Sequence, residues 1–182
     1  PLEKSVILEE IKMYADLPAH HVHDLMSEML WPGHPLGRPV SGLRESVARL
    51  SRLDLRRFYK RHYQPANFLL TVAGPVSHEA ILQRARRLFR GRSKIERLAV
   101  AKPRSFQSKP RACFLEKNSE QSHFVIGLPT FSRFHPLRYS LGLLNVILGG
   151  NMSSRLFEEI REKRALAYEI RTGSLFYKDT GA

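Results

Sequence analysis

The chain alternates between segments with a helical hydrophobic pattern and segments with an extended one. In the helical segments apolar side chains recur every three or four positions, so that Val6, Ile7 and Ile11 share one face of the first segment. Proline, glycine or a capping serine marks the ends of these segments. The predicted helices cover residues 3–16, 19–30, 51–62, 77–89, 136–148 and 153–163.

Two of these helices carry a start signal in the sequence. Ser51 precedes the third predicted helix, and Asp54 follows three residues later, which is the spacing of a capping box. Ser77 precedes the fourth helix in the same way. Residues 31–42 are expected to form a loop, because their prolines and glycines interrupt regular structure.

Shorter apolar runs bounded by turn residues predict β-strands. They are rich in Val, Phe, Leu and Ile, the residues that favour a pleated and buried surface. Combined with the helices, they predict an α+β fold with mixed or antiparallel sheets and helices packed on one face. The predicted strands cover residues 67–74, 112–116, 123–128 and 167–177.

Residues 91–110 show neither the helical nor the extended hydrophobic pattern, and basic residues, serine and proline dominate there. This composition is typical of an interdomain linker. We therefore expect one domain over residues 1–90, a linker over 91–110, and a second domain over 111–182.

Composition narrows the class of protein. The chain has 182 residues, 42% hydrophobic and 26% charged, which is typical of a globular protein. No apolar run approaches the roughly 20 residues of a transmembrane helix. The single cysteine, Cys113, excludes an intrachain disulfide and is expected to be a buried thiol in a strand.

The net charge of +13 is concentrated in one stretch. From Arg44 to Arg111 the sequence has 18 Lys and Arg residues against 4 Asp and Glu residues. Such a stripe could bind a polyanion. Because its arginines share amphipathic helices with Leu and Phe, and no aromatic–basic nucleic-acid motif occurs, a solvated basic face is the favoured interpretation.

Two glutamates occupy an unusual place in the first predicted helix. Glu3 and Glu10 are seven residues apart and therefore point within about 20° of each other, toward the centre of the apolar stripe. Buried carboxylates are costly unless they are paired, hydrogen-bonded or bound to a metal. Alternatively, the helix frays at its start so that Glu3 lies in solvent, and Glu10 forms one buried ion pair.

A second candidate site lies where the last predicted helix meets the last predicted strand. Arg161 and Tyr168 are spaced so that a guanidinium and a phenol could converge on a carbonyl or a developing oxyanion. The alternative is a structural role for both residues. Arg161 would interact favourably with the dipole at the helix C-terminus or pair with Glu158, and Tyr168 would be a half-buried strand residue.

Histidine spacing does not indicate a zinc site within the chain. The sequence contains neither H-E-x-x-H nor H-x-x-E-H, and His20, His21 and His23 do not form a His-x-x-x-His pair. There is also no phosphate-binding loop and no Gly-x-Ser-x-Gly nucleophile elbow.

Three longer motifs resemble one family. EKSVILEEIKMYADLP and HDLMSEMLWPGHPLGRPVSG resemble the region after the zinc motif of insulinase/pitrilysin-type zinc metallopeptidases, the inverzincins, including bacterial processing-peptidase-like proteins. LGGNMSSRLFEEIREKRALAY resembles the signature of the second domain in that family. The resemblance covers essentially the whole chain. It implies an internal piece, truncated at both ends, with the end of the first peptidase domain and the start of the second.

The resemblance also implies roles for four residues. Glu10 matches the distal zinc ligand, and Glu3 matches a glutamate that supports the metal site from the same helix. Arg161 and Tyr168 match the pair that holds the substrate near the scissile bond. The H-x-x-E-H motif, which supplies the other ligands and the general base, is absent. The chain alone is therefore expected to be inactive and to bind no zinc.

The sequence thus predicts a piece of a zinc metalloendopeptidase that hydrolyses extended peptides, with zinc in the full-length parent. The expected partners are a peptide or protein substrate and a second subunit in a homodimer or heterodimer. Neither a specific nucleic acid nor a membrane span is expected, and a bacterial cytoplasm or periplasm is favoured. Two alternatives stay open: a catalytically silent peptide-binding partner subunit, and a basic polyanion-binding module.

Overall fold

The computed structural model describes residues 2–89, 100–103, 107 and 109–182. They form two compact units, which are described separately. Unit 1 combines Pro1–Leu43 with Ala101–Ala182, and unit 2 is Arg44–Val100. No helix in the described part of the chain is long and apolar enough to cross a membrane.

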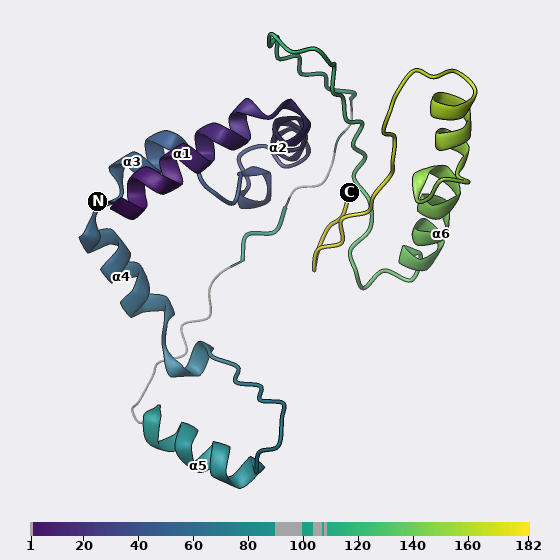
Figure 1. Cartoon of the computed structure of the whole chain (residues 1–182). Helices are drawn as coiled ribbons and strands as arrows, with labels where there is room; N and C mark the ends of the chain where they lie inside the picture. The colour runs from purple at the N-terminus through teal and green to yellow at the C-terminus, as the bar shows by residue number, and fades with distance from the viewer. Residues whose placement is uncertain (1, 90–99, 104–106, 108) are drawn as a thin grey trace. The chain divides into compact units, whose positions relative to one another are not determined.

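Unit 1 begins with two helices that contact each other, α1 (Leu2–Asp16) and α2 (Pro18–Leu30) (Figure 1). Pro18 separates them, because proline disfavours helical geometry in the residue before it, and Leu17 is extended with φ −99° and ψ 101°. The same proline suits the first position of α2, where no intrahelical N–H bond is needed. Both helices confirm the predicted ones.

The small core of unit 1 lies at the end of α2. Trp31 is 2% exposed, and its ring meets that of Tyr177 edge to face at 5.4 Å between centroids. The 3₁₀ turn η1 (Pro35–Gly37) closes the loop that follows Trp31. A side chain at Gly37 would collide with the Trp31 carbonyl oxygen, so glycine is required for this close approach.

An extended excursion, residues 109–130, runs out and back in unit 1 (Figure 1) and is tied to the first two helices. Arg111 Nη1 donates to the Met29 carbonyl at 2.9 Å. Lys117 Nζ donates to the Ala15 carbonyl at 2.8 Å and lies 3.2 Å from the Asp16 carboxylate. These bonds join α1 and α2 to a segment 82 to 102 residues further along the chain.

The rest of unit 1 consists of α6 (Arg138–Gly149), the short π-helix η3 (Phe157–Glu162) and an extended C-terminal segment. The C-terminal segment folds back on itself, because Leu175 and Ala182 exchange backbone hydrogen bonds of 2.8 and 2.9 Å. Thr172 Oγ1 donates to the Asn145 carbonyl and so attaches this segment to α6.

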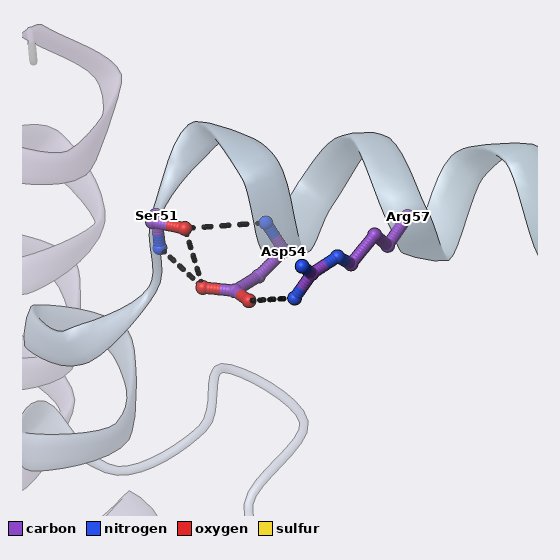
Figure 2. A network of polar contacts seen from close by, with 3 residues as sticks. All are labelled: Ser51, Asp54 and Arg57. Atoms are coloured by element: carbon purple, nitrogen blue, oxygen red, sulfur yellow. Dashed lines mark hydrogen bonds and ion pairs between the residues drawn. The ribbon is translucent and has the colours of Figure 1, made fainter.

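Unit 2 contains α3 (Arg44–Arg49), α4 (Arg52–His62), the 3₁₀ turn η2 (Pro65–Asn67) and α5 (His78–Leu88). The predicted capping box at the start of α4 is confirmed: Ser51 and Asp54 hydrogen-bond reciprocally, and Arg57 lies 3.9 Å from the Asp54 carboxylate (Figure 2). The Ser77 cap of α5 is confirmed as well. The helix α3 was not predicted.

The predicted α+β fold is wrong for the described residues, which contain helices but no β-strand or sheet (Figure 1). Residues 112–116, 123–128 and 167–177, and residues 68–74 after the turn η2, form no strand ladder. Isolated bridges join Gly181 to Thr130 and to Phe176. A strand pattern sets only the local backbone conformation, whereas a sheet needs partner strands for its N–H and C=O groups. Apolar side chains of the predicted strands are therefore exposed to solvent, and Phe114 is 93% exposed.

The same absence of a ladder corrects the expectation for Cys113, which is exposed rather than buried. The predicted division into two domains and a linker stays a prediction. Residues 91–99, 104–106 and 108 of the predicted linker lie outside the described part of the chain. Among the described residues the buried hydrophobic side chains are Leu30, Trp31 and Val47.

Candidate functional site

Glu3 and Glu10 both lie on α1, and both are exposed to solvent. Glu10, with Ser5, Val6, Glu9 and Met13, lines a shallow depression along this helix. The apolar residues of this face are open too, since Val6 is 46% exposed and Met13 50%. The two carboxylates are therefore not desolvated, and Glu10 does not require the buried ion pair that the sequence suggested as an alternative.

The donor set of the chain does not fit a complete zinc site. Structural and catalytic zinc sites use at least three protein ligands. In the described parts of the chain no three His, Cys, Asp or Glu side chains are grouped so that they could hold a metal ion. Glu10 could contribute one oxygen ligand, and Glu3 could orient it, only if other groups supplied the remaining ligands.

Arg161 and Tyr168 are brought together by the structure. The guanidinium carbon of Arg161 lies 5.1 Å from the centroid of the Tyr168 ring. Tyr168 is 85% exposed, so its hydroxyl is open to a ligand. Of the two predicted pairs, this is the one in which the two side chains are in contact.

A tight turn after η3 produces this contact. Leu166 N–H donates to the Ile160 carbonyl and Ala165 N–H to the Arg161 carbonyl, both at 3.0 Å. Ala165 adopts a φ of 50°, in the left-handed region that ends many helices. The chain therefore reverses at Ala165 and returns Tyr168 to the side chain of Arg161.

The hydrogen-bonded ion pair at η3 joins Glu159 to Lys163 and not to Arg161. The Lys163 ammonium hydrogen-bonds to Glu159, which lowers the pKa of this carboxyl and raises the pKa of Lys163. Arg161 has a weaker partner, because its Nε atom lies 3.7 Å from a Glu162 oxygen. The pairing with Glu158 that the sequence allowed does not form.

Arg161 also contacts a residue that the sequence reasoning missed. Its guanidinium carbon lies 4.7 Å from the centroid of the Phe157 ring. The signal was present, because Phe157 and Arg161 are four residues apart and such residues are neighbours on a helix surface. Arg161 is thus in cation–π range of two aromatic rings.

The chain matches a known protein family and has relatives among bacterial proteins. Residues 49–182 match the family described as the peptidase M16 inactive domain. An uncharacterized zinc protease of Streptomyces coelicolor is 36% identical over 99% of this chain and 40% of its own length. A similarly named protein of Bacillus subtilis is 35% identical over 98% of this chain and 43% of its own.

Two solved structures share the fold. A protease from Helicobacter pylori superposes with a TM-score of 0.76 at 20% identity, over 98% of this chain and 44% of that one. A peptidase M16 inactive domain from Pseudomonas fluorescens gives a TM-score of 0.72 at 21% identity, over 98% and 43%. The chain therefore spans less than half the length of each of these curated and structural relatives.

Proposed function

Because this chain belongs to the peptidase M16 family, we propose that it is part of a zinc metalloendopeptidase that hydrolyses extended peptides. The names of the curated relatives, zinc proteases, support this proposal. In it Glu10 is the distal zinc ligand and Glu3 supports it from the same helix. Arg161 and Tyr168 bind the substrate, and the full-length protein forms a homodimer or a heterodimer.

The observation that carries the proposal is the contact between Arg161 and Tyr168. A guanidinium presents N–H donors in a fixed fork, and a phenol adds one more donor. Among the described residues the Arg161 side chain makes no hydrogen bond, its ion pair with Glu162 spans 3.7 Å from Nε, and Tyr168 is 85% exposed. This arrangement suits the backbone carbonyl of an extended peptide.

The 182-residue chain by itself is expected to hydrolyse nothing, because its described residues contain no group of three potential zinc ligands, and a site needs at least three. We therefore propose no hydrolytic step for this chain alone. Its residues would bind and orient the peptide, while the remaining ligands and the general base would come from the rest of the protein.

The test is made on the full-length protein, with zinc content and cleavage of fluorescein-labelled β-casein as readouts. Glu10→Gln should lose both bound zinc and cleavage, because a neutral amide is a poor zinc ligand. Glu9→Gln is the matched control, since Glu9 lies next to Glu10 on α1 and lines the same depression. The proposal fails if Glu10→Gln retains zinc and activity as Glu9→Gln does.

One observation favours a second candidate, a catalytically silent peptide-binding subunit. The family matched by residues 49–182 is itself described as an inactive domain. A full-length protein that holds no zinc and cuts nothing, yet binds β-casein through Arg161, would support this candidate over the first.

A further inference from the structure

Arg161 has a different environment from the other described arginines. Two of them, Arg133 and Arg138, each lie over the ring of the next residue in sequence, at 5.0 and 4.4 Å. Arg161 lies over two rings, Phe157 at 4.7 Å and Tyr168 at 5.1 Å, which come from the helix and from the segment after it. Among the described residues no other cation contacts two rings.

These rings contact the guanidinium without occupying its N–H donors. A cation–π contact acts on the face of the planar group, whereas a carboxylate partner would occupy its N–H donors. The carboxylate of Glu162 lies 3.7 Å from Nε, which is too far for a hydrogen bond. Glu159 is occupied by Lys163 and Arg164. The donors at the outer end of Arg161 consequently stay available.

We propose that Phe157 is a positioning residue for Arg161, which keeps the guanidinium fixed and its terminal donors ready for a peptide carbonyl. This proposal rests on the proposed function, in which Arg161 binds the substrate. Tyr168 is 85% exposed and follows a turn, so it is a less rigid support than Phe157, which is half-buried on the helix itself. A preorganised donor loses less entropy when the substrate binds.

Phe157→Leu in the full-length protein tests the proposal. Leucine keeps an apolar side chain but removes the ring, so Arg161 must be ordered when the substrate binds and the KM for β-casein should rise about threefold to tenfold, while kcat changes little. Phe157→Trp should restore KM, because indole is a better cation–π partner. Phe134→Leu is the matched control, since Phe134 also contacts an arginine but lies outside the site.

A double mutant shows whether Phe157 acts through Arg161. In an Arg161→Ala background, Phe157→Leu should add no further change in KM. The proposal is overturned if the two effects are additive, or if Phe157→Leu alone leaves KM unchanged.

A spectroscopic readout separates this proposal from the proposed function. The δ-protons of Arg161 should be shifted upfield in NMR spectra by the ring currents of Phe157 and Tyr168, and Phe157→Leu should reduce this shift without any substrate. If β-casein is neither bound nor cut, the proposed function fails, while the shift still decides whether Phe157 holds Arg161. An unchanged shift in Phe157→Leu overturns the positioning role itself.

Discussion

Ala165 has a backbone conformation that its side chain disfavours. Its φ of 50° places it in the left-handed region. Among the described residues no other non-glycine residue has a positive φ. For an L-residue this region costs about 1–2 kcal/mol, because Cβ approaches the carbonyl oxygen. The cost falls on the turn that brings Tyr168 back to Arg161.

Replacing Ala165 with glycine should therefore stabilise the chain. Glycine removes the clash but gains freedom in the unfolded state, so we expect the free energy of unfolding to rise by about 0.5–1 kcal/mol. Urea unfolding of the chain measures the change. Ala167→Gly is the control and should destabilise, because the φ of Ala167 is negative. Equal destabilisation by both substitutions would contradict the strain at Ala165.

At the scale of an element, α4 depends on a charged cap. The pKa of Asp54 is lowered by hydrogen bonds from the Ser51 side chain and backbone and, to a smaller extent, by the charge of Arg57. Since the folded pKa lies below the unfolded value, the stabilisation is fully present above the unfolded pKa. It is lost as the pH falls through the folded pKa.

We expect Ser51→Ala to move the titration midpoint of Asp54 up toward its ordinary value of 3.8, because the largest cause of the lowering is removed. NMR titration of the Asp54 carboxyl in the full chain measures the midpoint. Arg57→Gln should shift it less, since the charge of Arg57 is the smallest cause. A larger shift in Arg57→Gln would show that the ion pair, not the cap, controls Asp54.

At the scale of the whole molecule, the two units differ in how much they bury. Unit 1 contains the buried Trp31 and Leu30, whereas in the described part of unit 2 the buried hydrophobic side chain is Val47. Several aromatic residues of unit 2 pack in a row but stay open: Tyr59 stacks on Tyr63 at 4.7 Å and is 60% exposed. Burial of apolar surface is the main source of stability.

Unit 2 should consequently unfold at lower urea concentration than unit 1. Trp31 is the single tryptophan of the chain, so its fluorescence reports on unit 1, whereas far-UV circular dichroism reports on the helices of both units. We expect the circular dichroism change to begin before the fluorescence change. Coincident transitions by both probes would instead indicate one cooperative unit.

Local features of the site followed from local sequence. The capping box of α4 needs only residues three positions apart, and the helix pattern of α1 placed Glu3 and Glu10 on one helix. The contact of Arg161 with Tyr168 was an open possibility, and the contact with Phe157 was missed. The contact with Tyr168 depends on the left-handed turn at Ala165, a position where no glycine marks the turn in the sequence.

The sequence by itself determined the helices α1, α2, α4, α5 and α6 and the caps of α4 and α5, because these depend on residue types at short, fixed spacings. Its longer motifs pointed to the family that the comparisons show. Tertiary structure alone decided that the extended segments form no sheet, that Glu3, Glu10 and Cys113 are exposed, and that Lys117 is tied to α1. These outcomes depend on which distant segments come together. A spacing pattern specifies the face a residue shares, but not the partner that covers it.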